Sequence, residues 1–261
     1  MSDTKEWIYK IDTLYYQYQN PKKKFEFKDI IIPRQTLSII TGETGLGKTT
    51  LLNILGLEDY LRIEGENNDI LFRPDIQKET IKYSSIYRSK KKIQKIRKNF
   101  GFMFQQDYLI DAMTCWENIF IPYFLRKKDS NEYKKANDLI KEFGFKDLLE
   151  NEKNEKNEIT PPMNRSPSTL SGGQRQRVAL IRAMIHSPLI VFADEPLASV
   201  NEKIAIDIMN SFIKQVKRGM TIIMIGHDTY NHIYKSIDTN DYNRYVNIIK
   251  LENHVTKFYK T

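Results

Sequence analysis

The chain contains three short runs of predominantly apolar residues, at 37–41, 189–193 and 221–225. Runs of this length with almost no charge are typical of strands buried on both faces of a parallel sheet. Apolar residues at helical spacing follow the first run, at 51–55, and precede the third, at 205–217. Because buried strands alternate with amphipathic helices, the pattern predicts an α/β fold around a parallel sheet.

The N-terminal region has a different pattern, in which apolar and polar residues alternate. Residues 7–18 and 25–32 alternate in this way, with an Asn-Pro pair and three lysines between them. This arrangement predicts an antiparallel β-hairpin. Tyr16 and Tyr18 share a face of the first strand, and one of them is a candidate to stack on a purine base. The alternative is that these tyrosines fill a half-exposed face of the sheet.

Two further segments have helical patterns. Between residues 112 and 144 an apolar stripe, interrupted by Pro122, predicts helices that belong to the hydrophobic core. Residues 88–98 are strongly basic, with Ile93 and Ile96 at helical spacing. We interpret this basic run as the solvated face of a helix, and contact with phospholipid headgroups or nucleic acid is the alternative.

The segment between the first apolar run and its helix has the pattern of a phosphate-binding loop: Gly42, Glu43, Thr44, Gly45, Leu46, Gly47, Lys48, Thr49 and Thr50. The glycines allow successive backbone N–H groups to point at one anion, and the helix dipole strengthens the site. Lys48 is then placed to reach the outer phosphates, and the Thr49 hydroxyl to ligate Mg²⁺. The loop therefore predicts binding of a nucleoside triphosphate.

Polar residues also follow three of the predicted strands, at the ends where parallel α/β sheets bind ligands. We expect Asp194 to hold Mg²⁺ and its neighbour Glu195 to polarise an attacking water molecule. His227 follows the third apolar run and is expected to contact the γ-phosphate. Gln105 ends a further apolar segment, where its amide is suited to sensing bound Mg²⁺ or water.

A second helix with an open N-terminus is predicted after residue 170. Ser171 is placed as its N-cap, and Gly172 and Gly173 leave the helix end accessible to an anion. The alternative interpretation is an ordinary capped helix.

Composition narrows the class of protein without identifying it. The chain has 261 residues, enough for one α/β domain, and no apolar run approaches the length of a membrane span. Its single cysteine, Cys115, lies among apolar residues and suits a buried thiol in a reducing compartment. The N-terminal residues lack a signal-peptide pattern, which predicts a cytoplasmic protein. The formal net charge of +8 is compatible with an anionic partner and equally with solubility alone.

Together and in this order, the motifs resemble those of the ATP-binding cassette (ABC) transporter ATPases. The phosphate loop corresponds to the Walker A motif, residues 189–195 to the Walker B motif with its catalytic glutamate, and His227 to the switch histidine. Gln105 corresponds to the Q-loop. The signature motif, which is highly specific, corresponds to residues Leu170, Ser171, Gly172, Gly173 and Gln174. The resemblance covers nearly the whole chain.

The resemblance implies one ABC ATPase domain over residues 1–261. Its fold would be a RecA-like P-loop NTPase core with an N-terminal antiparallel β-subdomain, formed by 1–105 and 187–261, and an inserted α-helical subdomain at 106–186. It also implies ATP hydrolysis with ATP and Mg²⁺ as cofactors, using Lys48, Gln105, Glu195 and His227, with the metal at Thr49, Gln105 and Asp194. Tyr18 is the implied adenine-stacking residue, with Tyr16 second.

The resemblance further implies two kinds of partner. Two cassettes of the family pair head to tail, so residues 171–173 of one subunit would close over the γ-phosphate held by the Lys48 loop of the other. The second cassette would be identical or related. An integral membrane permease subunit would be moved by the helical region after Gln105, as ATP shifts the population toward the closed dimer. The protein is then expected at the inner face of the cell membrane, without a specific nucleic-acid partner.

Segments 51–56, 100–105 and 116–119 resemble the branch of the family that includes macrolide-export and lipoprotein-release ATPases. Asn201 departs from the aspartate that is usual after the Walker B motif, keeping hydrogen-bonding capacity without the charge. The alternative function is a soluble, non-transport ABC ATPase in DNA repair or translation, which the basic charge favours. A binding module that has lost catalysis is disfavoured, because Lys48 and Glu195 are both present.

Overall fold

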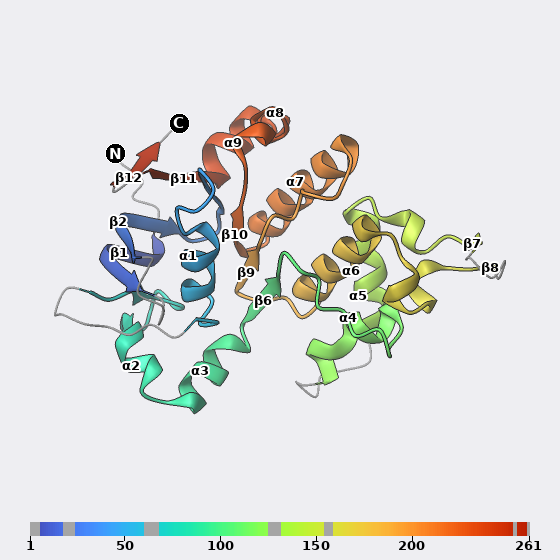
Figure 1. The fold of residues 1–261 in the computed structure, drawn as a ribbon, viewed down its shortest axis with the longest axis horizontal. Coiled ribbons are helices and arrows are strands. Elements are labelled where there is room, and N and C mark those ends of the chain that lie inside the picture. Colours follow the sequence, from blue (N-terminus) through green and yellow to red (C-terminus); the bar gives the residue numbers. More distant parts are fainter. Residues whose placement is uncertain are drawn as a thin grey trace.

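The computed structural model describes residues 6–17, 24–59, 68–124, 132–153, 159–252 and 255–259. In this part of the chain a four-stranded sheet and a six-stranded sheet form one side of the molecule (Figure 1). A group of helices extends from the six-stranded sheet on the other side.

The six-stranded sheet has the strand order β12-β11-β3-β10-β9-β6. Its strands are β3 (Leu37–Gly42), β6 (Phe100–Met103), β9 (Ile190–Ala193), β10 (Thr221–Ile225), β11 (Val246–Glu252) and β12 (Val255–Tyr259). All pairs are parallel except β11 with β12, at one edge. The predicted parallel sheet is confirmed, and the three apolar runs form its adjacent strands β3, β10 and β9.

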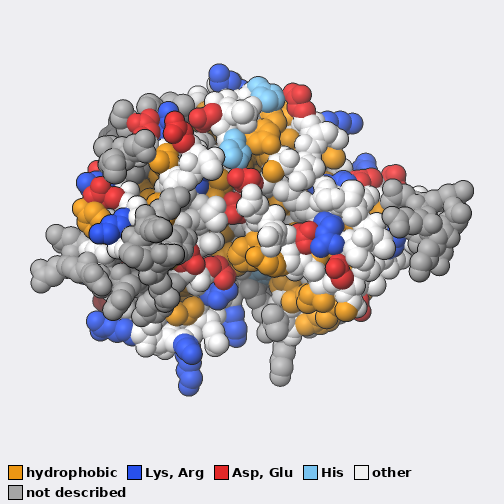
Figure 2. Space-filling view, in the orientation of Figure 1, with side chains coloured by type: hydrophobic (Ala, Val, Ile, Leu, Met, Phe, Trp, Pro, Cys, Tyr) orange, Lys and Arg blue, Asp and Glu red, His pale blue; other side chains and the backbone are white. Residues whose placement is uncertain are grey.

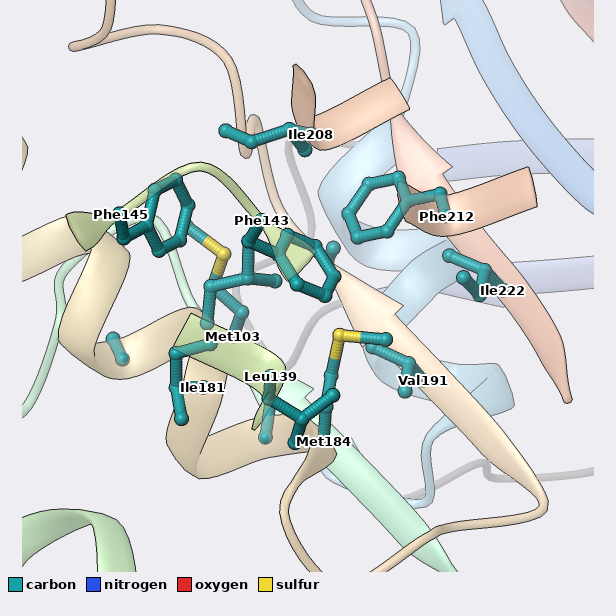
Figure 3. Packing of buried hydrophobic residues seen from close by; sticks show 14 of the residues in the cluster. Met103, Leu139, Phe143, Phe145, Ile181, Met184, Val191, Ile208, Phe212 and Ile222 are labelled. Atoms are coloured by element: carbon teal, nitrogen blue, oxygen red, sulfur yellow. The ribbon is translucent and has the colours of Figure 1, made fainter. Parts of the chain in front are cut away.

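Both faces of this sheet are buried, because successive residues of a strand point to opposite faces and enter different hydrophobic clusters. Ile223 packs in the cluster that contains α1 (Lys48–Leu55) and the four-stranded sheet. Ile222 packs in the cluster on the other face, with α6 (Gly172–Met184) and α7 (Glu202–Lys217). Figure 3 shows Val191 and Ile222 beside Met184 and Phe212 in this second cluster.

The four-stranded sheet has the order β2-β1-β4-β5, and each pair is antiparallel. Its strands are β1 (Trp7–Gln17), β2 (Lys24–Pro33), β4 (Leu71–Phe72) and β5 (Ile81–Lys82), so the predicted hairpin is confirmed. Tyr16 lies opposite Phe25 and is only 9% exposed, so its side chain belongs to the core. Tyr18, the first candidate for adenine stacking, lies outside the described residues.

The helical region after Gln105 contains α4 (Cys115–Phe124), α5 (Glu132–Glu142) and α6, which contact one another. Pro122 lies within the last turn of α4, so the helix continues two residues past the predicted interruption. Pro122 has no N–H group to donate to the Asn118 carbonyl oxygen, so α4 lacks one backbone hydrogen bond in its last turn. The short strands β7 (Glu152–Lys153) and β8 (Ile159–Thr160) pair antiparallel at the edge of this region.

The remaining helices are short and lie mostly at the surface: α2 (Tyr83–Tyr87), α3 (Lys90–Arg97), α8 (Asn231–Tyr234), α9 (Thr239–Tyr245), and the 3-10 helices η1 (Lys146–Leu148), η2 (Pro162–Asn164), η3 (Pro167–Thr169) and η4 (Asp228–Tyr230). No residue of α3 is buried, which confirms a solvated helix face for the basic run. Figure 2 shows Lys and Arg side chains protruding along the lower edge, where Figure 1 draws α2 and α3. None of the helices in the described ranges has the length and apolar character needed to cross a bilayer.

Candidate functional site

The glycine-rich loop joins β3 to α1, as the sequence predicts. Gly42 has φ of 135° and Gly47 has φ of 92°, both in the left-handed region that glycine tolerates best. A Cβ atom on Gly42 would lie 2.4 Å from the Leu251 carbonyl oxygen, and one on Gly47 would lie 2.6 Å from the Phe25 ring. Gly47 caps α1 without a side-chain hydrogen bond, so the first N–H groups of the helix stay available to an anion.

Lys48 lies over this loop. Its ammonium group donates hydrogen bonds to the carbonyl oxygens of Gly42, at 2.7 Å, and Glu43, at 3.0 Å. Thr49 is exposed and Thr50 is buried, so the two threonines face different surroundings. The exposed residues Glu43, Thr44 and Gly45 form the open side of the loop, and Leu46 packs against the core.

Asp194 follows β9 and faces the start of α1, where the Thr49 hydroxyl hydrogen-bonds to it. Burial, together with the neighbouring Glu195 carboxylate, raises the pKa of Asp194 to about 6, against the opposing effects of Thr49 and Lys48. The Asp194 Oδ1 atom is buried and has no hydrogen-bond partner within the described part of the chain. A buried carboxylate oxygen without a partner, beside a hydroxyl group, fits a divalent cation.

The protein supplies only part of the ligand set for such a cation. Among the described residues, His, Cys, Asp and Glu side chains form no group of three or more that is arranged to hold a metal ion. Mg²⁺ commonly takes one or two protein oxygens together with substrate phosphates and water. The Thr49 hydroxyl and the Asp194 carboxylate have the chemistry of such protein ligands.

Glu195 lies at the centre of a group of polar side chains. The Nε2 atom of His227 is 2.9 Å from its Oε1, and the Nε2 atom of Gln105 is 3.4 Å from its Oε2. The backbone of Glu195 has φ of 53°, a left-handed conformation that is rare for residues other than glycine. Such a conformation persists only where the surrounding structure enforces it, and residues of this kind cluster at functional sites. The fold thus brings together the ends of β6, β9 and β10, as predicted.

The signature residues lie at the N-terminal end of α6, which Figure 1 draws on the opposite side of β6 and β9 from α1 and the phosphate loop. Ser171 is the N-cap of α6, as predicted, and completes a capping box with Gln174. A Cβ atom on Gly173 would lie 2.7 Å from the Ser199 carbonyl oxygen, whereas one on Gly172 would meet nothing within 4 Å. Packing within this chain therefore requires glycine at position 173 but not at position 172.

Asn201 has a local role at the start of α7. Its side-chain oxygen accepts a hydrogen bond from the Ile204 N–H at 3.0 Å, which makes it the N-cap of the helix. Asparagine and aspartate cap helices about equally well, so the departure from aspartate preserves this contact.

Sequence reasoning assigned no role to Gln176, although it connects two parts of the site. Its side chain donates to the Glu195 carbonyl oxygen at 3.0 Å and accepts from the Ser199 N–H at 3.2 Å. The spacing contained a signal, because Gln176 lies one helical turn after Gly172 and therefore on the same face of α6. The contact ties α6 to the loop that carries Glu195.

A phosphate loop after β3, with acidic residues at the end of β9, the next strand but one in the same parallel sheet, defines a P-loop nucleoside triphosphatase. Comparison with known proteins narrows this class. The family described as ABC transporter matches residues 29–198. The lipoprotein-releasing system ATP-binding protein LolD of Aquifex aeolicus is 33% identical over 213 residues, which cover 79% of this chain and 77% of that protein.

Other relatives agree. An uncharacterised ABC transporter ATP-binding protein of Methanocaldococcus jannaschii is 36% identical over 191 residues, covering 73% of this chain and 74% of that protein. The macrolide export ATP-binding/permease protein MacB of Bdellovibrio bacteriovorus is 31% identical over 197 residues, covering 76% of this chain and 26% of that longer protein.

Solved structures support the same assignment. The dimeric ABC transporter cassette MJ0796 superposes with a TM-score of 0.68 at 27% identity, covering 95% of both chains. A second structure of that cassette, a dimeric post-hydrolysis state bound to ADP and Pi, has the same TM-score and covers 96% of this chain. The chain therefore belongs to the ABC transporter family, as one of its ATP-binding subunits that hydrolyse ATP. This confirms the resemblance drawn from the motifs.

Proposed function

We propose that ATP hydrolysis takes place at the site formed by the phosphate loop, Asp194, Glu195, His227 and Gln105. Glu195 is the general base that accepts a proton from the attacking water, and His227 and Gln105 orient its carboxylate. The contacts of 2.9 Å and 3.4 Å to its two oxygens are the observation that carries this proposal. Lys48 moves from the loop carbonyl oxygens to the outer phosphates and offsets their charge.

Mg²⁺ completes the proposed site, held by Thr49, Gln105 and Asp194. When bound, the metal supplies positive charge to the phosphate oxygens. Adenine stacking is assigned to Tyr18, in preference to the buried Tyr16. Backbone N–H groups from Gly42 to Thr50 bind the phosphates, with Glu43, Thr44 and Leu46 contributing through their main chain.

The active form is proposed to be a head-to-tail dimer of two cassettes, identical or related. Gly172 supports this, because a Cβ atom here would meet nothing within 4 Å, so packing among the described residues does not require glycine. A phosphate held by a second subunit would require it, since a side chain would separate the anion from the N–H groups of α6. The relative MJ0796 is itself a dimeric cassette.

A separate integral membrane permease is the proposed partner, with the cassette peripheral at the cytoplasmic face of the membrane. Export or lipoprotein release is the proposed type of transport, because the relatives include LolD and MacB. An apolar cavity of about 740 Å³ between α3, β6, α4 and α6 is a suitable receptor for a permease segment. Its lining includes the exposed side chains Tyr108 and Ile110.

The division of the chain is proposed to follow these functions. Residues 1–105 and 187–261 form the nucleotide-binding core with the β-subdomain, and residues 106–186 form the helical subdomain with the signature motif. The grouping of α4, α5 and α6 to one side of the six-stranded sheet supports this division (Figure 1).

The decisive experiment measures the solution mass of Glu195→Gln by light scattering, with and without ATP and Mg²⁺. We expect the mass to double with ATP, because binding is retained while hydrolysis is blocked. Lys48→Ala/Glu195→Gln is the matched control, which should remain monomeric because it cannot hold the phosphates. If Glu195→Gln binds ATP and remains monomeric, the proposed homodimer is contradicted. Closure of the dimer would then require a different cassette or the permease.

A further inference from the structure

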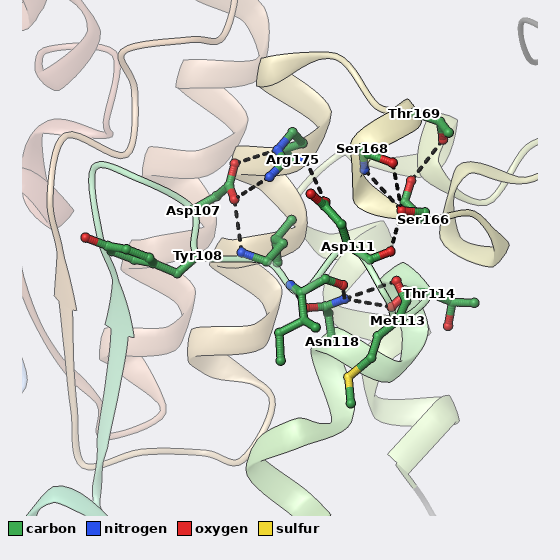
Figure 4. A network of polar contacts seen from close by, with 12 residues as sticks. Asp107, Tyr108, Asp111, Met113, Thr114, Asn118, Ser166, Ser168, Thr169 and Arg175 are labelled. Atoms are coloured by element: carbon green, nitrogen blue, oxygen red, sulfur yellow. Dashed lines mark hydrogen bonds and ion pairs between the residues drawn. The ribbon is translucent and has the colours of Figure 1, made fainter.

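A paired arginine and aspartate join the segment after Gln105 to the first turn of α6. Arg175 Nε lies 2.7 Å from Asp107 Oδ2, and Arg175 Nη2 lies 2.9 Å from Asp107 Oδ1, so the contact is bidentate (Figure 4). Arg175 Nη1 also reaches Asp111 Oδ1 at 3.2 Å. The two side chains of the main pair are only 24% and 22% exposed. A half-buried bidentate pair holds its partners in one geometry better than an exposed single contact does.

The position of this pair relates it to the nucleotide site. Asp107 lies two residues after Gln105, whose side chain contacts Glu195. Arg175 lies directly after the signature residues, whose helix end is the proposed contact for the phosphate of a second subunit. The pair therefore links two parts of the molecule. One is the segment of Gln105, at the proposed nucleotide site of this subunit, and the other is the N-terminus of α6, the proposed contact for the phosphate of a second subunit.

The segment that carries Asp107 is itself held to α6. Arg182, further along α6, donates hydrogen bonds to the carbonyl oxygens of Asp107 and Tyr108. Tyr108 has φ of 45°, a left-handed conformation, and its side chain is directed away from Arg175 (Figure 4). As long as the hydrogen bonds of Arg182 are intact, the segment that carries Asp107 and Tyr108 is expected to move together with α6.

We propose that Asp107 and Arg175 are positioning residues, which set the direction of the α6 N-terminus according to the position of Gln105. When Gln105 moves to a bound nucleotide, Asp107 moves with it, and Arg175 carries the first turn of α6 into alignment for closure of the dimer. This inference rests on the proposed head-to-tail dimer. In the dimer, each site would consist of the phosphate loop of one subunit and the α6 N-terminus of the other. The Asp107–Arg175 ion pair would then make the geometry of one site depend on whether nucleotide is bound at the other.

Other contacts keep α6 folded without this pair. Gln176 bonds to the Glu195 carbonyl oxygen and the Ser199 N–H, and the apolar face of α6 lies in the core. Loss of the ion pair is therefore expected to alter the direction of the helix end and to leave the fold intact.

The chain also provides a matched control. Arg177, two residues further along α6, makes a bidentate pair with Asp147 at 2.6 Å and 2.7 Å. Asp147 lies in η1, within the helical region, so this pair has the same chemistry but does not reach the segment after Gln105.

The test compares Asp107→Asn, Arg175→Lys and Asp147→Asn in the Glu195→Gln background. We measure the ATP concentration that gives half of the dimer by light scattering, and the binding of a fluorescent ATP analogue to the monomer at high dilution. Asp107→Asn and Arg175→Lys should each raise the dimerisation midpoint at least about fivefold, the lower range of typical coupling between sites. Monomer binding should stay within about twofold of the parent, because the phosphate loop is unchanged.

The double variant Asp107→Asn/Arg175→Lys should be no worse than Arg175→Lys alone, because Arg175→Lys already breaks the bidentate contact with Asp107. The control Asp147→Asn should leave the dimerisation midpoint unchanged. An unchanged midpoint in Asp107→Asn would overturn the proposal, as would an equal shift in Asp147→Asn, which would indicate a purely structural role.

A second measurement keeps the proposal testable if the parent remains monomeric with ATP, a result that would contradict the proposed function instead. Amide hydrogen exchange at residues 171–175 should then respond to ATP in the parent and not in Asp107→Asn. Equal responses in the two chains would overturn the positioning role.

Discussion

His227 Nε2 lies 2.9 Å from Glu195 Oε1, although 32 residues separate them in the chain. The two residues meet because each follows one of two neighbouring parallel strands, β10 and β9, in which Met224 is paired with Ala193. Parallel strands end at the same edge of a sheet, so residues just after them become neighbours. The contact orients both side chains, since a histidine nitrogen that bonds to a carboxylate fixes the ring.

Replacement of Glu195 should separate ATP binding from hydrolysis. We expect Glu195→Gln to retain ATP binding and to lower turnover by at least about a hundredfold, because an amide is not a general base. His227→Ala should also lower turnover. If His227 acts by orienting Glu195, the double variant should be no slower than Glu195→Gln alone, since residues that act as a unit are not additive. Phosphate release in the steady state measures all three variants, and independent effects would contradict the shared role.

Lys48→Ala should abolish ATP binding or turnover. The change removes the positive charge expected at the outer phosphates, together with the bonds to the Gly42 and Glu43 carbonyl oxygens that hold the loop. Lys90→Ala, at the start of the exposed helix α3, is the control and should leave hydrolysis unchanged. Near-normal hydrolysis by Lys48→Ala would exclude the proposed active site.

Asp194→Asn should stabilise the chain without metal or nucleotide at high pH. The pKa of Asp194 is about 6 in the folded protein, above the ordinary value of about 3.9. The protonated Asp194 carboxyl group therefore contributes its full stabilisation of the fold below the pKa of the unfolded chain. This contribution is lost as pH rises through about 6. The thermal unfolding midpoint of Asp194→Asn should exceed that of the parent at pH 8, by a margin that shrinks toward pH 5. An equal margin at both pH values would contradict the raised pKa.

Gly172→Asp should separate stability of the subunit from its assembly. The new side chain has free space, and a negative charge at a helix N-terminus is stabilising by about 0.3–1 kcal/mol. The thermal midpoint of the monomer should therefore be maintained or raised, while ATP-driven dimerisation in the Glu195→Gln background is lost by repulsion of the phosphate. Gly173→Ala should instead lower the midpoint, because its Cβ would press on the Ser199 carbonyl oxygen. Dimerisation of Gly172→Asp at the parental ATP concentration would contradict the role of this helix end.

Cys115 should be unreactive in the native protein. It is fully buried, and burial raises the pKa of its thiol to about 12. The nucleophilic thiolate is then negligible at pH 8, so iodoacetamide should modify the cysteine only after denaturation. Mass spectrometry of native and denatured samples measures this, and rapid native modification would contradict the packing of α4.

The sequence by itself predicted the local structure, because that structure depends on residues close together in the chain. Apolar runs identified β3, β9 and β10, alternation identified the hairpin of β1 and β2, and Ser171 identified the start of α6. The phosphate loop could be identified for the same reason, since its glycines, Lys48 and Thr49 all lie within nine residues. Pro122 interrupts the apolar stripe without ending α4, which continues to Phe124, so the proline alone did not give the helix boundary.

Only the tertiary structure decided which distant residues meet. The order of the strands brings Gln105 and His227 to the two oxygens of Glu195, and the packing of α6 brings Arg175 to Asp107 across 68 positions. Burial was decided in the same way, since alternation placed Tyr16 on a face of β1 without showing that the face is covered. Alternation and spacing report only the direction of a side chain along its own element, whereas contact and burial depend on which element lies opposite.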